Sequence, residues 1–138
     1  MSDPIGLSHP INPSELRLLL VDDDSDTLRV VTRILTRRGY LVTPADSVQA
    51  ALLAAEQQTF ALVISDIALP DGTGHDLVSG LKAKYPIKAI AVSGYGKAED
   101  VAQSLGAGFD AHLTKPVTVE AVEQTIERLM RTPELPRP

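Results

Sequence analysis

A short apolar run that ends in three consecutive acids constrains this chain more than any other stretch. Residues 18–21 read Leu-Leu-Leu-Val, and Asp22, Asp23 and Asp24 follow directly. The run is too short for a buried helix and has no period-2 alternation, so it predicts a strand covered on both faces, as in a parallel sheet. Ligands of such sheets bind just beyond the carboxyl ends of the strands. The acids therefore either hold a hard divalent cation such as Mg²⁺ or face the N-terminus of a following helix, and both can be true.

Length and charge narrow the class of protein. A chain of 138 residues predicts one domain with a single core. The net charge of −5 argues against a nucleic-acid surface, and the absence of Cys excludes disulfides, a thiolate nucleophile and Cys-based metal sites. No secretory signal or run of transmembrane length occurs, so we expect a cytoplasmic protein whose domain makes no membrane contact. Prolines gather at both ends, which predicts a flexible leader or linker at 1–13, a folded domain at 14–131 and a disordered tail at 132–138.

Between the two ends, strand-like and helix-like segments alternate. The predicted strands are 16–21, 40–43 (closed by Pro44), 61–65, 89–92 and 110–113. The predicted helices are 24–38, 47–58, 76–84, 97–105 (stopped by Gly106 and Gly108) and a last one that Thr118 caps. Five strands alternating with five helices predict an α/β fold with a doubly wound five-stranded parallel sheet and right-handed crossovers.

Polar residues follow four of these strands. Asp22 and Asp23 follow the first strand, Asp66 the third, Ser93 the fourth and Lys115 the fifth. Each alone is commonly a cap, a turn residue or a solvated loop charge. Parallel strands bring their carboxyl ends to one edge, so we expect these side chains to meet in one cleft. Together they suit phosphoryl transfer, which needs a nucleophilic oxygen, a divalent ion, a cation and a hydroxyl donor; a carboxylate such as Asp66 can form an acyl phosphate.

These motifs make the chain resemble the receiver domain of two-component response regulators over residues 15–130. The matching motifs are Val21-Asp22-Asp23, Ile64-Ser65-Asp66, Leu69-Pro70 with Gly74, Ser93-Gly94 and Lys115-Pro116. The resemblance implies a flavodoxin-like strand order of 2-1-3-4-5. It also implies that Asp66 is the phosphorylation site and that Ser93 and Lys115 bind the phosphoryl group, which makes these three the catalytic set. The implied Mg²⁺ ligands are Asp22, Asp23, Asp66 and the backbone carbonyl of Ala68, and Pro116 is expected to follow a cis peptide.

The resemblance further implies partners and a signalling role. The expected phosphodonor is a histidine kinase or a histidine phosphotransfer domain. The domain would catalyse its own phosphorylation and dephosphorylation and turn over no separate substrate. The run Ser93-Gly94-Tyr95-Gly96 resembles receivers of hybrid histidine kinases, so we expect either a free-standing receiver or one from a longer chain of that kind.

Some positions depart from the family pattern. Leu69 stands where Met is common, a volume-conserving change. The switch position in the fifth strand, usually Tyr or Phe, is His112, which either serves as the switch with Ser93 or is a half-exposed edge residue. An inward His112 is expected to be neutral, because burial disfavours the charged imidazole. The switch would remodel the face formed by the fourth helix, fifth strand and last helix, which could also mediate self-association. Ala68 and Tyr95 flank the expected path of the hydrolytic water and offer no group to orient it, which predicts slow dephosphorylation.

Three other interpretations remain to be weighed. Gly106-x-Gly108-x-x-Ala111 fits a dinucleotide fingerprint by letters but joins a helix to a strand, which is the wrong order, and no P-loop occurs. Asp71-Gly72-Thr73 resembles part of the motif of haloacid-dehalogenase-like phosphotransferases, although Leu69 replaces the first Asp. A degenerate receiver that acts only as an interaction module would have lost Asp66, Lys115 or the acidic pair, and all of these are present.

Overall fold

The computed structural model of the chain describes residues 16–94 and 98–131, and the side chains at 98–100 are outside the description. The predicted leader 1–13, the predicted tail 132–138 and Tyr95 lie outside the described residues. Within them, one parallel sheet has the order β2-β1-β3-β6-β7. Its strands are β1 (Arg17–Val21), β2 (Leu41–Ala45), β3 (Leu62–Asp66), β6 (Lys88–Ser93) and β7 (Ala111–Thr114). Counted among these five, the order is 2-1-3-4-5, so the predicted fold class and strand order are confirmed.

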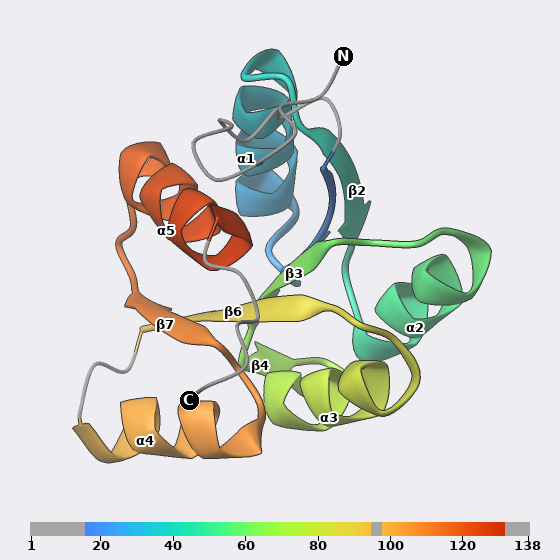
Figure 1. The fold of residues 1–138 in the computed structure, drawn as a ribbon, viewed down its shortest axis with the longest axis vertical. Helices are drawn as coiled ribbons and strands as arrows, with labels where there is room; N and C mark the ends of the chain where they lie inside the picture. The colour runs from blue at the N-terminus through green and yellow to red at the C-terminus, as the bar shows by residue number, and fades with distance from the viewer. Residues whose placement is uncertain (1–15, 95–97, 132–138) are drawn as a thin grey trace, which may run out of the picture.

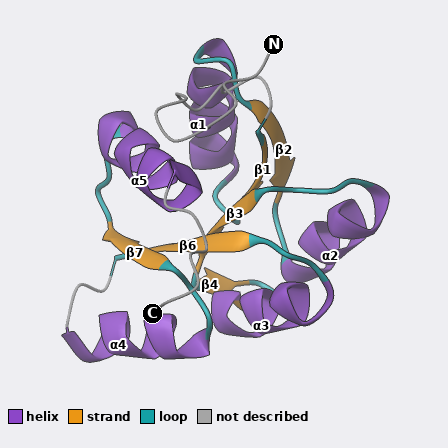
Figure 2. Ribbon diagram, in the orientation of Figure 1, coloured by secondary structure: helices purple, strands orange, loops and turns teal. Residues whose placement is uncertain are grey.

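Helices cover both faces of this sheet (Figures 1 and 2). One face carries α1 (Ser25–Arg37) and α5 (Val119–Arg131), and the other carries α2 (Val48–Gln57), α3 (Gly74–Lys84) and α4 (Ala98–Ala107). The continuous apolar run of β1 contributes side chains to the hydrophobic core on both faces of the sheet, because successive side chains of a strand point to opposite faces. Leu18 and Leu20 pack with α1 and α5, whereas Leu19 and Val21 pack with α2 and α3.

Several element ends follow from local chemistry. Ser47 caps α2 by accepting a hydrogen bond from the Ala50 amide at 3.0 Å. Thr118, predicted to cap the last helix, accepts one from the Ala121 amide at 3.1 Å. Asp24 is the N-cap residue of α1, so the acidic run does lead into a helix.

Three boundary predictions were wrong. Pro44 lies inside β2 instead of closing it, which is tolerated because β2 is an edge strand and needs no amide donor on its open side. Helix α3 begins at Gly74, two residues before the predicted 76, because Thr73 caps it by accepting from the Asp76 amide. Helix α4 continues through Gly106 to Ala107 and ends before Gly108, whose φ of 120° favours glycine.

A two-stranded antiparallel ribbon between β3 and α3 was not predicted. Its strands are β4 (Ala68–Leu69) and β5 (Gly72–Thr73), and Ala68 pairs with Thr73 while Leu69 pairs with Gly72. Strands of two residues are too short to show a periodic pattern in the sequence. The ribbon begins immediately after the end of β3, beside the acidic edge of the sheet.

Candidate functional site

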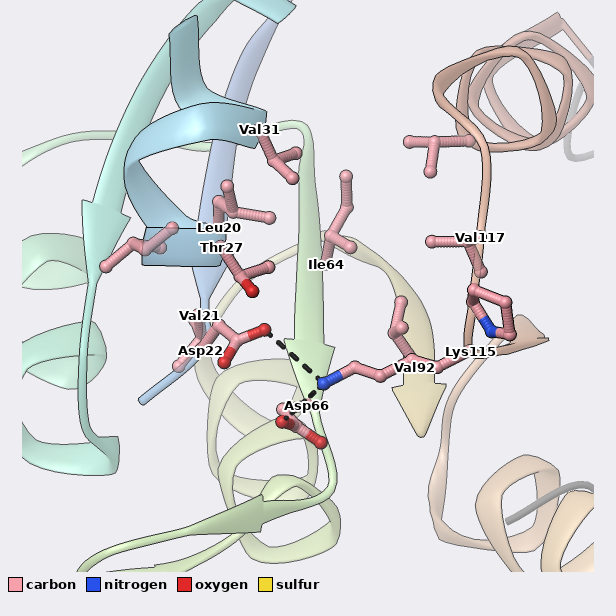
Figure 3. A pocket seen from close by; sticks show the side chains of 13 residues that line it. Leu20, Val21, Asp22, Thr27, Val31, Ile64, Asp66, Val92, Lys115 and Val117 are labelled. Atoms are coloured by element: carbon pink, nitrogen blue, oxygen red, sulfur yellow. Dashed lines mark hydrogen bonds and ion pairs between the residues drawn. The ribbon is translucent and has the colours of Figure 1, made fainter. Parts of the chain in front are cut away.

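The carboxyl-terminal edge of the sheet brings together side chains from β1, β3 and the residue after β7. Asp22 follows β1, Asp66 ends β3, and Lys115 reaches toward both carboxylates from the loop after β7 (Figure 3). The Lys115 Nζ lies 3.1 Å from Asp66 Oδ2 and 3.6 Å from Asp22 Oδ2. The expected convergence at one edge is therefore present for these three residues.

Three carboxylates meet at this edge. Asp22, Asp23 and Asp66 each offer an oxygen, and these oxygens all lie within 4.8 Å of one another. Two carboxylates about 4 Å apart repel by roughly 4 kcal/mol at an effective dielectric of 20. An all-oxygen, anionic donor set suits a hard divalent cation, and Mg²⁺ is held in proteins by few carboxylates of this kind. The residues present therefore fit the ion that the sequence analysis expects.

Burial separates the first two acids. Asp22 is only 6% exposed, whereas Asp23 is exposed. Burial raises the pKa of the Asp22 carboxyl; the Asp24 amide, donating to Asp22 Oδ1 at 2.9 Å, and the Lys115 ammonium oppose this shift. Asp66 and Asp23 raise it further through charge repulsion. A nearby cation therefore favours the charged form of the Asp22 carboxyl.

Lys115 supplies a fixed positive charge. Burial disfavours its charged form, but the hydrogen bond to Asp66 and the nearby Asp22 carboxylate outweigh burial and raise the Lys115 pKa above its ordinary value. The ammonium is therefore protonated at neutral pH. The Lys115–Pro116 peptide bond is cis, and the Lys115 amide donates to the Ser93 carbonyl at 2.7 Å, which ties the lysine loop to the end of β6.

The loop after Asp66 is tightly built. The Ile67 amide donates to Asp66 Oδ1 at 2.8 Å and the Gly74 amide donates to the Ile67 carbonyl at 2.7 Å. A Cβ at Gly74 would lie 2.4 Å from the Asp66 carbonyl oxygen, so only glycine fits there. Ala68 begins β4 two residues after Asp66 and is exposed.

Ser93 and His112 are in direct contact. Ser93 is 3% exposed, and its Oγ lies 3.1 Å from His112 Nε2. Ala111 and Leu113, on either side of His112, pack toward α1 and α5, so alternation directs His112 to the opposite face, where α4 lies. Ser93 and His112 were predicted to act together as a switch, but this hydrogen bond was not predicted. The signal that could have suggested it is that Ser93 ends one strand and His112 lies near the carboxyl end of the neighbouring strand, on the same face.

A cavity of about 440 Å³ lies beside the site, between α1, α5 and the sheet (Figure 3). Its walls are mainly apolar, and its polar lining residues are Asp22, Thr27, Asp66 and Lys115. The apolar lining is Leu20, Val21, Leu28, Val31, Ile64, Val92, Pro116, Val117 and Val122. This cavity was not predicted from the sequence, because the distance between two helices that pack on a sheet leaves no local sequence pattern.

The fold and the composition of this edge define a receiver domain of the two-component type. The family model of the response regulator receiver domain matches residues 18–127, and the chain belongs to this family. Membership in this family sets aside the haloacid-dehalogenase interpretation. Among the described residues, no helix is long and apolar enough to cross a bilayer.

Individual relatives agree with this assignment. The transcriptional regulatory protein KdpE of Mycobacterium tuberculosis is 37% identical over 99 residues, which are 72% of this chain and 44% of KdpE. The photosynthetic apparatus regulatory protein RegA of Rhodovulum sulfidophilum is 34% identical over 122 residues, which are 88% of this chain and 66% of RegA. The chain thus spans less than half of the length of KdpE and about two thirds of the length of RegA. A CheY-like response regulator receiver domain protein from Methanospirillum hungatei has a crystal structure that matches with a TM-score of 0.77 at 35% identity, covering 83% of this chain and 93% of that one.

Proposed function

We propose that this domain accepts a phosphoryl group on Asp66 in the presence of Mg²⁺, from a phosphohistidine of a histidine kinase or a histidine phosphotransfer domain. The observation that carries this proposal is the convergence of Asp22, Asp23 and Asp66 within 4.8 Å, with the Lys115 ammonium 3.1 Å from Asp66. A degenerate receiver would lack part of this set. The presence of the whole set supports a domain that is active in phosphoryl transfer.

The proposed reaction uses the Asp66 carboxylate as the nucleophile. One carboxylate oxygen forms a bond to phosphorus while the bond from phosphorus to the donor imidazole breaks, and the imidazole nitrogen retains the electron pair. Lys115 already contacts the Asp66 carboxylate and is close enough to form an ion pair with the oxygens of a phosphoryl group bound there. The Ile67 amide holds the other side of the Asp66 carboxylate, which favours one orientation of the nucleophile.

The acidic set is proposed to hold Mg²⁺ through Asp22, Asp23, Asp66 and the Ala68 carbonyl. When bound, the ion neutralises charge on the transferring phosphoryl group. Without it, three carboxylates and one ammonium leave the site net negative, which disfavours the approach of an anionic phosphodonor. Phosphorylation should therefore depend on the divalent ion.

The proposed output is a change on the face formed by α4, β7 and α5. The arriving phosphoryl group competes with His112 for the Ser93 hydroxyl, whose present contact with Nε2 spans 3.1 Å. Ser93 then moves toward the phosphoryl group, and His112 enters the space that it leaves. A partner or a second copy of the domain would bind this face and respond to its change. The proposed phosphohistidine donor is consistent with a domain that works in the cytoplasm.

The experiment is phosphorylation by a small phosphodonor, followed by intact mass. The wild type should gain one phosphoryl group with Mg²⁺ and none after chelation. Asp66→Asn keeps the shape of the side chain but removes the nucleophile, so it should gain none under either condition. Full labelling of Asp66→Asn would contradict the assignment of the phosphorylation site, and full labelling after chelation would contradict the role of the ion.

A further inference from the structure

The tip of the β4–β5 ribbon is fastened to helix α2 by a single carboxylate. Asp71 Oδ1 accepts a hydrogen bond from the Val48 amide at 2.8 Å, and Asp71 Oδ2 accepts one from the Gln49 amide at 3.0 Å. Asp71 and Val48 are 23 residues apart in the chain. Val48 is also close to the neighbouring Gly72, where a Cβ would lie 3.2 Å from Val48 Cγ2. The ribbon and the first turn of α2 are therefore in direct contact.

Asp71 completes the N-terminus of α2. The first amides of a helix have no partner within the helix. Here the first intrahelical bond runs from the Ala51 amide to the Ser47 carbonyl, so the amides of Val48, Gln49 and Ala50 need other acceptors. Ser47 Oγ satisfies only Ala50. The two amides that remain are both satisfied by Asp71, and these bonds lower the pKa of its carboxyl, Gln49 contributing more than Val48.

The other end of the ribbon is fastened to α3. The Gly74 amide donates a hydrogen bond to the Ile67 carbonyl, and Thr73 caps the first turn of α3. Between these two sets of contacts, the ribbon consists of two residue pairs, Ala68 with Thr73 and Leu69 with Gly72. Ala68 thus belongs to a short hairpin that is held at its base by α3 and at its tip by α2.

We propose that Asp71 is a positioning residue for Mg²⁺ binding, because it holds the ribbon so that the Ala68 carbonyl is fixed at the acidic edge before the ion arrives. This inference rests on the proposed function, in which Ala68 is a ligand. A flexible loop would have to be ordered at the moment of binding, and that cost would lower the affinity. By linkage, Mg²⁺ binding in turn stabilises the bonds from Asp71 to the first turn of α2.

The competing explanation is that Asp71 only caps a helix. The chain offers a matched control for it, because Ser47 caps the same helix N-terminus through the Ala50 amide, and in the described part of the chain no hydrogen bond joins Ser47 to the ribbon. Ser47→Ala weakens α2 and leaves the ribbon fastened. Asp71→Ala weakens α2 and frees the ribbon. Asp71→Asn removes the same charge as Asp71→Ala but keeps one acceptor oxygen. Comparing the two variants therefore distinguishes the loss of the hydrogen bonds to α2 from the loss of a negative charge that attracts Mg²⁺ at long range.

The experiment measures the Mg²⁺ dissociation constant by amide shift titration, at physiological ionic strength, for the wild type and the three variants. Asp71→Ala should weaken Mg²⁺ binding by about tenfold, the lower end of what removing a group that orients a metal ligand costs. Ser47→Ala should leave the constant within a factor of about two, and Asp71→Asn should lie between. Equal weakening by Ser47→Ala and Asp71→Ala, or equal weakening by Asp71→Asn and Asp71→Ala, would overturn the proposal.

Hydrogen exchange of the metal-free protein supplies a second readout. Asp71→Ala should speed exchange of the amides at 67–73 as well as those of Val48 and Gln49, whereas Ser47→Ala should leave 67–73 unchanged. A wild type that binds no Mg²⁺ would contradict the proposed metal site. Unchanged exchange at 67–73 in Asp71→Ala would contradict the positioning role, so the two failures are distinguishable.

Discussion

Two glycines of helix α3 allow a matched test of how the nucleophile is held. Gly74, the first residue of α3, leaves no room for a side chain, since a Cβ there would lie 2.4 Å from the Asp66 carbonyl oxygen and 3.2 Å from the Ile67 Cα. Both contacts are with backbone, which cannot rotate away. Gly80 lies in the same helix, is exposed, and has nothing within 4 Å of a Cβ. Alanine therefore creates a clash at one position and none at the other.

The two substitutions are expected to change the free energy of unfolding in opposite directions. Overpacking costs about 1–3 kcal/mol, and the gain from a less flexible unfolded chain returns about 0.4–1 kcal/mol, so Gly74→Ala should lower the free energy of unfolding by about 1–2 kcal/mol. Gly80→Ala should raise it by about 0.5–1 kcal/mol, the usual difference between the two residues inside a helix. A gap of about 2 kcal/mol between the variants corresponds to roughly 6–10 °C in Tm for a domain of this size.

Urea unfolding and labelling by a small phosphodonor test both consequences. The strain at Gly74 displaces the backbone of Asp66, and a displacement of about 1 Å in a reacting group can cost about 10²-fold in rate. Gly74→Ala should therefore be both less stable and much slower to phosphorylate, whereas Gly80→Ala should phosphorylate at the wild-type rate. A Gly74→Ala protein that is as stable as the wild type, or as fast, would refute the steric argument.

Three further predictions concern the metal, the lifetime of the phosphoryl group and the response to pH. Asp23→Asn should weaken Mg²⁺ affinity more than Asp22→Asn, because resemblance to the family assigns Asp22 a contact largely through water; equal titrations for the two variants would show that this ranking is wrong. The double variant Ala68→Asn with Tyr95→Glu should lose its phosphoryl group faster than the wild type in Mg²⁺ without a kinase, since both new side chains can orient a water; an unchanged half-life would contradict the role of water access. Burial raises the pKa of the Tyr40 phenol, and the neighbouring glutamates of α5 raise it further. Because the folded-state pKa is the higher one, this stability is complete below the unfolded value of about 10 and is lost as the pH rises through the folded value. Tyr40→Phe should therefore lose less stability than the wild type above about pH 10 in urea unfolding. An equal loss of stability in the two proteins above this pH would argue against this account.

The sequence by itself determined the layers of the fold and the candidates for the site. The run from Leu18 to Val21 is short and apolar at every position, which predicts a strand buried on both faces, and the structure confirms this. Helix capping was also determined locally: Ser47 and Thr118 cap the helices that they were predicted to cap. Asp66 and Lys115 were selected by sequence because each directly ends or closely follows an apolar strand. Periodicity and strand ends can be predicted from sequence because they depend on neighbouring residues in the chain.

Only the tertiary structure decided which of these groups touch and what holds them. The contact of Ser93 with His112 depends on the register of two strands, and the clash at Gly74 depends on how α3 approaches the end of β3. The bonds from Asp71 to α2 join residues up to 23 positions apart, and Asp71 lies in a segment for which neither a helix nor a strand was predicted. Boundaries such as Pro44 in β2 were wrong for the same reason, since edge position in a sheet is a property of the assembled fold. Local patterns encode which elements form and which faces are buried, whereas contacts across the chain arise only when those elements pack together.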